Sequence, residues 1–229
     1  MCRKVFVFVL LAALLMVSQS VFAESITAFG NIGLGHMKWA IEGDDGETTW
    51  TESESSPAVA IQAGLVYELP VGFGIGGIFD RVDMKLGYSY HQEWNGVKND
   101  NDEEDRVLLN GYGAIVTYRL PTSEVDCEVF AGAVRYTFTK TYTYNPGGFI
   151  RKVERDPAIG FIGGANVKTP VWNSLYLTGA FAYRSVSFGE GTITEKWSAD
   201  VFAPTNGYTT EPPIQVTSWS LTAGIAYKF

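Results

Sequence analysis

Apolar and polar residues alternate one by one along much of this chain, most clearly over its last fourteen residues, 216–229. The apolar members of this alternation are Trp219, Leu221, Ala223, Ile225, Tyr227 and Phe229. Because successive side chains of a β-strand point to opposite faces, the pattern predicts a strand with one apolar and one small, polar face. Aromatic residues lie at both ends of the apolar face and aliphatic residues between them, which is typical of a lipid-facing strand in a transmembrane β-barrel.

Seven further segments alternate in the same way, and together they predict an all-β protein. Their approximate bounds are 26–39, 57–69, 75–91, 106–120, 127–144, 156–168 and 174–188. The links between them are short near 70–72, 121–126 and 170–173, and long and polar at 42–56, 92–105, 145–155 and 189–215. This rhythm predicts an eight-stranded antiparallel up-and-down transmembrane β-barrel with short periplasmic turns and long extracellular loops. The segments exceed the ~9–11 residues that cross a membrane, so we expect the excess to extend the barrel wall beyond the lipid.

The direction of each side chain is predicted by one rule, with large apolar residues facing lipid and small or polar residues facing the lumen. This rule sends outward the apolar residues of the third and fifth segments, Val82, Met84, Leu86, Phe130, Val134, Tyr136 and Phe138. It sends inward a charged set, Glu68, Arg81, Asp83, Lys85, Arg119, Arg135 and Arg184. Because a buried charge that loses its partner costs about 3–5 kcal/mol, we expect this set to form an ion-pair network that fills and rigidifies the lumen.

Two other arrangements compete with this interpretation. A soluble, lipocalin-like barrel would place its large apolar residues inside and its polar residues outside. The lumen of eight strands has room only for side chains, and inward Val, Phe and Tyr on every strand would not fit, so the sequence favours the membrane barrel. The basic excess of the charged set leaves a second alternative open, a narrow path that favours small anions.

The amino terminus and the composition restrict the possibilities further. Residues 1–23 combine a basic start (Arg3, Lys4), a short apolar run and a small-residue ending, which predicts a cleaved signal peptide before a barrel domain at residues 24–229. Cleavage leaves 15 Lys and Arg against 25 Asp and Glu, so the formal charge falls from −8 to −10. An acidic protein is a poor partner for nucleic acid. The mature chain keeps one cysteine, Cys127, and therefore no internal disulfide.

The eight alternating segments, the loop rhythm, the leader and the ending Ala226-Tyr227-Lys228-Phe229 together resemble the eight-stranded outer-membrane barrel families. These are the OmpA transmembrane domain, OmpX and the opacity-type surface proteins. The resemblance covers the whole mature chain and implies a multi-pass protein of the cell outer membrane. It also implies contact with outer-membrane lipid and lipopolysaccharide, and recognition of Tyr227 and Phe229 by the β-barrel assembly machinery. We expect a monomer.

Several motifs in the sequence bear on cofactor or ligand binding. Gly72, Gly74 and Gly77 fit G-x-G-x-x-G, but a strand and not a helix follows, so they predict a turn and no nucleotide site. The acidic loops 42–54 and 100–105 lack the spacing of an EF-hand and predict no metal site. We therefore expect no cofactor. Four basic residues near the outer rim could pair with lipopolysaccharide phosphates: Lys140, Arg151, Lys152 and Arg155.

The predicted function is structural or interactive, in membrane integrity or adhesion, with any binding located in the loops. The apolar residues near loop tips that could contact a partner are Trp50, Phe149 and Tyr208. A narrow channel is the second candidate. A lipid A-modifying enzyme is the third, because related barrels use a histidine–serine pair near the outer rim and here Ser89 and His91 share a strand face. The predicted register points this pair into the lumen, away from lipid, so we expect no enzymatic activity.

Overall fold

The computed structural model describes residues 25–44, 49–69, 72–94, 97–121, 125–145, 149–196 and 210–229, and within these the side chains of 42–52, 88–102, 144–145 and 196 are left out. The strands are β1 (Ser25–Asp44), β2 (Thr49–Glu68), β3 (Phe73–Trp94), β4 (Val97–Arg119), β5 (Asp126–Asn145), β6 (Phe149–Trp172), β7 (Leu175–Phe188), β8 (Gly191–Lys196), β9 (Thr210–Glu211) and β10 (Ile214–Lys228). No helix among these residues is long and apolar enough to cross a membrane. The predicted leader, residues 1–23, lies outside the described residues and stays a prediction.

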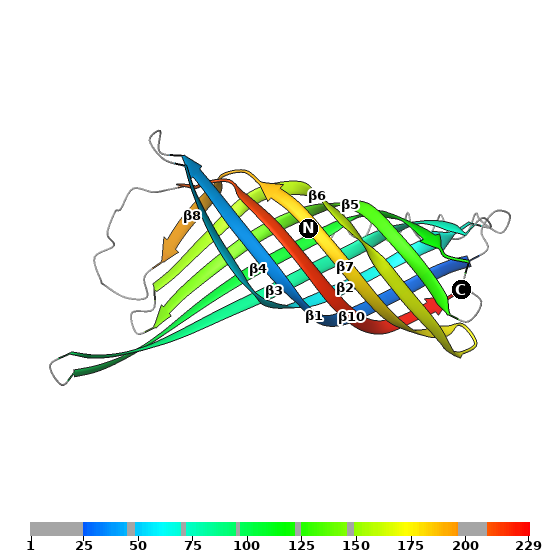
Figure 1. Cartoon of the computed structure of the whole chain (residues 1–229), viewed down its shortest axis with the longest axis horizontal. Helices are drawn as coiled ribbons and strands as arrows, with labels where there is room; N and C mark the ends of the chain where they lie inside the picture. The colour runs from blue at the N-terminus through cyan, green and yellow to red at the C-terminus, as the bar shows by residue number, and fades with distance from the viewer. Residues whose placement is uncertain are drawn as a thin grey trace.

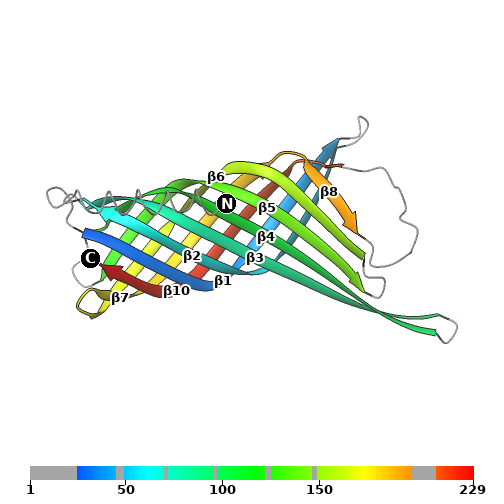
Figure 2. The same ribbon diagram turned by 180° about the vertical axis from the view of Figure 1, so that it is seen from behind.

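Eight of these strands close into an antiparallel barrel, which confirms the predicted fold (Figures 1 and 2). Each of β1 to β6 pairs with the next strand along the chain, and β10 lies between β7 and β1. In the closing ladder, Ile32 on β1 is opposite Ala223 on β10 and, on its other side, Ile61 on β2. Closure pairs every wall strand on both sides, so the membrane-spanning sheet has no free edge.

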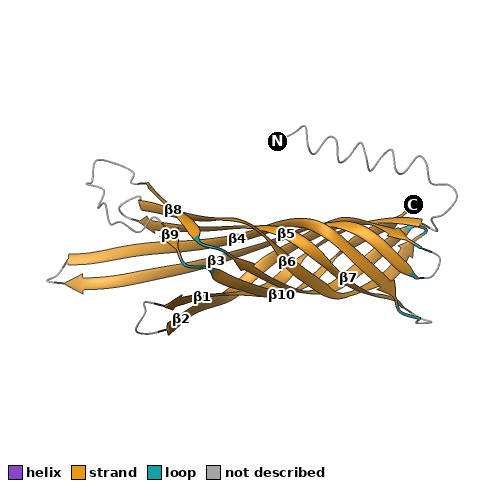
Figure 3. Ribbon diagram, turned by 90° about the horizontal axis from the view of Figure 1, so that it is seen from above, coloured by secondary structure: helices purple, strands orange, loops and turns teal. Residues whose placement is uncertain are grey.

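The strands are longer than the sequence indicated, because pairing continues into segments expected to be loops. β3 and β4 pair as far as Trp94 and Val97, and their hairpin reaches beyond the other strands (Figure 3). At the other end of the barrel the connections are tight. Gly72 has φ of 80° and Asn173 has φ of 42°, conformations that glycine and asparagine tolerate best. The predicted turn role of Gly72 is therefore confirmed.

The barrel wall has a break near its loop end. The β5–β6 register shifts between Tyr136 and Phe138, where β6 has two residues, Asp156 and Pro157, opposite the single Thr137 of β5. Proline cannot donate a ladder hydrogen bond and is found at such bulges. Above the break, β6 no longer pairs with β7 and pairs instead with β8, which in turn pairs with the short β9.

The half of the barrel nearest the short turns carries a belt of exposed apolar side chains. It includes Ile32, Leu34, Val59, Ile61, Ile75, Val116, Ile159, Leu177, Phe181, Leu221 and Ile225. Aromatic side chains border it, with Phe73, Tyr118, Trp172, Tyr227 and Phe229 at the turn end and Phe79, Tyr112, Tyr183 and Trp219 at the other. A lipid-facing band between two aromatic girdles is the signature of outer-membrane barrels. The chain is a multi-pass β-barrel of the outer membrane.

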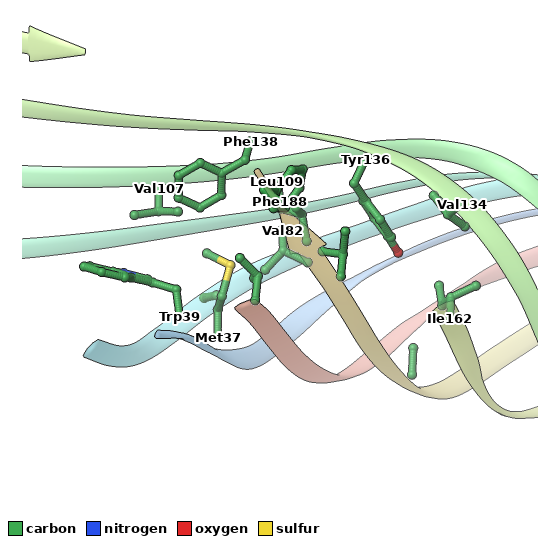
Figure 4. Close-up of a cluster of buried hydrophobic side chains, with 14 of the residues drawn as sticks. Met37, Trp39, Val82, Val107, Leu109, Val134, Tyr136, Phe138, Ile162 and Phe188 are labelled. Carbon is green, nitrogen blue, oxygen red and sulfur yellow. The ribbon is translucent and has the colours of Figure 1, made fainter. Parts of the chain in front are cut away.

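Beyond this belt the pattern reverses, and the interior is apolar (Figure 4). The inward residues of this half form one buried cluster that includes Met37, Trp39, Val82, Met84, Val107, Leu109, Tyr136, Phe138, Val186 and Phe188. The predicted facing of β3 and β5 is therefore wrong. Val82, Met84, Leu86, Phe130, Val134, Tyr136 and Phe138 all point inward or pack on this cluster. The physical reason is that the outer half of the wall faces water, so its apolar residues turn away from the outside.

Candidate functional site

A charged lock lies in the middle of the barrel, on inward positions of β3 and β7. Arg184 donates from Nε to Asp80 Oδ2 (2.6 Å) and from Nη2 to Asp80 Oδ1 (2.7 Å), and both side chains are at most 1% exposed. Gln62 and the Tyr136 hydroxyl also donate to Asp80, at 3.2 and 3.0 Å. Arg184 donates in addition to Ser220 Oγ (3.0 Å). A buried pair with this many hydrogen bonds is well compensated for its lost hydration.

A second ionic cluster fills the lumen at the periplasmic end, around Glu68. This carboxylate accepts from Thr27 Oγ1 (2.7 Å), Ser25 Oγ (2.9 Å), Arg119 Nη2 (2.7 Å) and Lys228 Nζ (3.1 Å). Lys168 extends the cluster, with its Nζ 3.8 Å from Glu68 and 2.7 Å from Glu128. Glu68 and Arg119 thus lie together inside the barrel, with two lysines that the predicted network did not include.

Four members of the predicted lumen network lie on the outer wall instead: Arg81, Asp83, Lys85 and Arg135. Asp83 accepts from Arg81 (3.1 Å) and from Arg106 Nε (2.9 Å), and Lys85 is 3.3 Å from Glu104. The hydrogen bond from Arg106 holds the pKa of the Asp83 carboxyl below its ordinary value. Arg135 donates to the Tyr112 hydroxyl at 2.9 Å. The prediction failed because it assigned polar positions to the lumen along the whole strand, although beyond the lipid they face water.

Between the ionic cluster and the outer mouth, the lumen is filled with side chains. The cavities at its periplasmic half, lined by Thr117 and Glu128 or by Asn31 and Thr178, have volumes of about 10 Å³ each. This is the space that one water molecule needs. Above them are the Asp80–Arg184 lock and then the apolar cluster. The described lumen therefore contains two ionic layers followed by an apolar layer.

A larger cavity of about 300 Å³ opens above the apolar cluster, at the extracellular end, and we call it the cup. Its lining residues are Lys140, Tyr142, Phe149, Arg151, Val153 and Glu211. The first two are inward positions of β5, the next three are inward positions of β6 above its bulge, and Glu211 comes from β9. The cup thus depends on the break in the wall, since β9 approaches only where β8 replaces β7 as the partner of β6.

The cup mixes paired charges with unpaired polar atoms. Lys140 Nζ is 3.2 Å from Asp105 and lies 4.5 Å from the ring centre of Trp39, and Arg151 is 3.4 Å from Glu211. Trp39 Nε1, Asp105 Oδ1 and Arg151 Nε are buried without a hydrogen-bond partner. Buried polar atoms normally have partners, and each unsatisfied one carries a cost. Of the charged residues, Lys140, Arg151 and Glu211 line the cup and face a molecule that enters it.

The basic residues predicted at the rim have different roles. Lys140 and Arg151 face the cup, and Lys152 lies outside, 2.7 Å from Glu154. Arg155 is buried and donates to the carbonyls of Gly189 (2.6 Å) and Pro212 (2.7 Å) and to Glu211 (3.2 Å), joining the strand ends around the break. Burial lowers the pKa of its guanidinium from the ordinary value.

Of the remaining predicted residues, some have described side chains and others do not. Phe149 is the first residue of β6, next to the β5–β6 loop, and lines the cup, 6.2 Å between ring centres from Tyr142. The side chains of Trp50, Ser89, His91 and Tyr208 lie outside the described residues. Tyr227 and Phe229 form an edge-to-face pair, 4.8 Å between centres, on the outer surface at the turn end.

No protein-family model and no curated protein sequence matches this chain. Among solved structures, the chain is similar to the outer membrane protease OmpT from Escherichia coli (TM-score 0.49, 11% identity, 92% of this chain and 99% of that one). It is also similar to the outer membrane protein OprG from Pseudomonas aeruginosa (0.45, 13%, 91% and 97%). A third similar structure is Ail, the attachment invasion locus protein of Yersinia pestis, in complex with the heparin analogue sucrose octasulfate (0.40, 12%, 88% and 99%). These likenesses are distant in sequence and geometry, and none bears on the activity of this chain.

Proposed function

We propose that this protein is a closed, non-enzymatic outer-membrane barrel that acts by binding at the cell surface, with the cup as its binding site. The observation that carries this proposal is the filled lumen beneath an open cavity. Three successive layers, the Glu68 cluster, the Asp80–Arg184 lock and the apolar cluster, support closure. The cup lies above all three, at the extracellular end of the described lumen.

The ligand that fits this cup is a polar saccharide end. Cations (Lys140, Arg151) and a carboxylate (Glu211) are spaced around aromatic edges (Tyr142, Phe149), and an apolar ligand would leave these charges unsatisfied. The volume of about 300 Å³ is at the small end of ligand sites and suits one or two sugar rings.

The test is a glycan-binding screen with the protein refolded in detergent, comparing wild type with Arg151→Gln. Lys152→Gln is the matched control, since it removes the same charge from the next residue of β6 on the outer wall. We expect a saccharide that binds wild type and the control and binds Arg151→Gln about tenfold more weakly, since hydrogen bonds to a charged group contribute about 1.5–3 kcal/mol. Equal affinity for Arg151→Gln and wild type would remove the cup from the proposal.

The second candidate, a narrow channel, is separated by recording from planar bilayers. A closed barrel gives no conductance steps, whereas steps at constant voltage in purified wild-type protein would support the channel. A release assay for acyl chains from lipid A tests the absence of enzymatic activity, and loss of any release in His91→Ala would establish an enzyme.

The proposal also includes assembly and oligomeric state. We propose that Tyr227 and Phe229 are recognised by the β-barrel assembly machinery, an idea supported by their exposure at the end of the last strand. Phe229→Ala should then lower the amount of folded protein in the outer membrane without lowering the stability of protein refolded in vitro. Light scattering in detergent should give the mass of a monomer.

A further inference from the structure

Three neighbouring strands of the barrel wall are interrupted above the lipid-facing belt (Figure 1). The ladders that β6 forms with β7 and with β8 share one register, and so do the β7–β10 and β8–β9 ladders. β8 therefore continues β7, and β9 continues β10, each after a short break. In this shared register Pro157, Gly189 and Pro213 fall in one row across the wall.

The residues in and beside this row explain why pairing stops. Pro157 lies in β6, and Pro212 and Pro213 separate β9 from β10. Proline has no N–H to donate to a ladder and is confined to strand ends, edges and bulges. Among the described residues, β6 has no ladder partner on its β7 side over 156–160. The wall is held there by fewer backbone hydrogen bonds than elsewhere.

The interruption also reverses which residues of these strands face inward. Below it, the inward residues of β6 and β7 have even numbers, as Ile162 and Arg184 do. Above it, the odd-numbered Arg151 and Val153 of β6 and Glu211 of β9 line the cup. We call the strand ends above the interruption the flap, and it consists of residues 149–155, 191–196 and 210–211.

The flap is attached to the rest of the barrel along one side. Its residues 149–155 pair with 138–144 of β5. On the other side, the described pairing of β1 with β10 ends at Ile41 and Ile214, and β9 is separated from β1 (Figure 3). A sheet held by one ladder can turn about that ladder. Because four of the six lining residues of the cup lie on the flap, such a turn changes the width of the cup.

One side chain joins the three interrupted strands. Arg155, at the base of the flap on β6, donates from Nη1 to the carbonyls of Gly189 (2.6 Å) and Pro212 (2.7 Å). Its Nη2 donates to Glu211 (3.2 Å), and its side chain is 1% exposed. Hydrogen bonds from a charged donor are among the stronger ones in proteins. These bonds take the place of the missing ladder bonds and fix the angle between the flap and the barrel.

Arg155 reaches Glu211 because the residue between them has no side chain. Gly191 is opposite Arg155 on one side and Glu211 on the other. A Cβ atom on Gly191 would lie 2.9 Å from Val153 Cγ1 and 3.1 Å from Arg155 Cζ. Both distances are shorter than a favourable carbon–carbon contact. A larger residue in place of Gly191 therefore displaces the guanidinium.

We propose that the flap is a movable wall of the cup, and that Arg155 holds it closed by reaching across Gly191. In the closed arrangement Glu211 stays beside Arg151 at the cup. When the hydrogen bonds of Arg155 break, the flap turns about the β5–β6 ladder and the cup widens on the side of β1. The motion is a property of the wall itself, whereas its use as an entrance for a saccharide rests on the proposed function.

The test measures two distances by pulsed electron paramagnetic resonance in the full mature protein refolded in detergent, with Cys127→Ser to remove the native thiol. One pair of spin labels joins Thr194 of the flap to Lys38 of β1, and the reference pair joins Ser187, below the interruption, to Lys38; all three positions are exposed. We expect a closed and an open distance for the flap pair and one distance for the reference pair. Arg155→Gln should raise the ratio of open to closed molecules about tenfold, since hydrogen bonds from a charged donor are lost, and leave the reference pair unchanged.

Two glycine variants provide a matched comparison, because they make the same change two residues apart. Gly191→Ala displaces Arg155 and should raise the open fraction as Arg155→Gln does. At Gly189 a Cβ atom meets no other atom within 4 Å, and alanine restricts the chain, so Gly189→Ala should leave the ratio unchanged or lower it. Both variants keep every charged group, so they test the proposal even where Arg155→Gln fails to fold.

Retention of the heat-modifiable folded form shows that the barrel of each variant is intact. Equal ratios in wild type, Arg155→Gln and Gly191→Ala would overturn the proposal, and so would an equal change in the reference pair. The measurement contains no saccharide. A moving flap in a protein that binds no saccharide would therefore remove the proposed function alone, and a rigid flap in a protein that binds one would remove the flap alone.

Discussion

The two halves of this barrel place their apolar and charged residues in opposite ways. In the membrane half the outside is apolar and the inside is ionic, around Glu68. In the extracellular half the outside carries charges such as Asp83 and Arg106, and the inside is packed with apolar residues such as Leu109 and Phe138. The strands run through both halves without a change of pleat, as β3 shows, with Phe79 outward and Val82 inward.

The difference teaches that the surrounding solvent, and not the strand, decides which residues face out. In lipid there is no hydrophobic gain from turning an apolar residue inward, and every buried polar group must find its partner inside the protein. In water the apolar residues gain free energy by burial, as in a soluble protein. The extracellular half is thus a soluble barrel continued from a membrane one, with the Asp80–Arg184 lock near their junction.

The largest expected effect comes from breaking that lock. Asp80→Ala leaves Arg184 buried without its carboxylate, and loss of one partner of a buried pair costs about 3–5 kcal/mol. Urea unfolding of the refolded barrel measures this cost. Asp83→Ala is the matched control, because Asp83 lies only three residues further along β3 but on the outer wall, and exposed pairs contribute about 0–1 kcal/mol. Comparable losses in the two variants would refute the opposite facing of the two carboxylates.

A core truncation tests the apolar interior of the extracellular half. Leu109 is fully buried there, so Leu109→Ala should lower the free energy of unfolding by about 2–5 kcal/mol through lost burial and a residual cavity. Leu221→Ala removes the same atoms from the lipid-facing belt, where lipid fills the space, and should cost less than half as much. A larger loss for Leu221→Ala than for Leu109→Ala would contradict the comparison of the two halves.

Substitutions that add a charge to the outer surface should locate the boundary between the lipid-facing belt and the water-facing wall. Ala223 lies in the middle of the lipid-facing run of β10, and Ala223→Arg should cost about 2–4 kcal/mol. Ser187→Arg places the same side chain on the outer wall beyond the belt and should cost close to zero. Refolding yield into bilayers of defined thickness and unfolding midpoints measure both. If Ser187→Arg were as costly as Ala223→Arg, the lipid would extend higher than the aromatic rows indicate.

The sequence predicted the fold and most outward faces because, in the membrane half, the large apolar residues of each alternating strand do face lipid. The outward faces of β2, β4, β6, β7 and β10 follow the prediction, with Ile61, Val116 and Leu221 as examples. β3 and β5 were assigned wrongly, since most of their large apolar residues lie in the extracellular half, where the same alternation has the reverse meaning. The sequence did contain a signal of this reversal, because the large apolar residues of β3 move from odd-numbered positions such as Phe79 to even-numbered positions from Val82 onward.

The candidate site was less predictable, because its geometry is non-local. Arg184 was expected in the lumen, but its partner Asp80 is 104 residues away in sequence, and the nearby Asp83 was the more visible candidate. Asp80 stands alone as a charge between the inward Ile78 and Val82, a pattern that indicates a buried pair once the facing of β3 is known. The cup depends on the bulge at Pro157 and on the approach of β9, and no local pattern in the sequence indicates either contact.

The smallest expected effect is a dependence on pH that arises on the outer wall. Arg106 lowers the pKa of Asp83 below the ordinary value of 3.8 in the folded barrel, so the folded state binds this proton less readily than the unfolded chain does. Asp83 therefore contributes its stabilisation fully above the ordinary value and loses it as the pH falls through the lowered one. Urea midpoints of wild type and Asp83→Asn should differ at neutral pH and converge in strong acid. Because Asp83 is partly exposed to salt and water, the difference should also shrink at high ionic strength, and a difference that grew in acid would reverse the assigned sign.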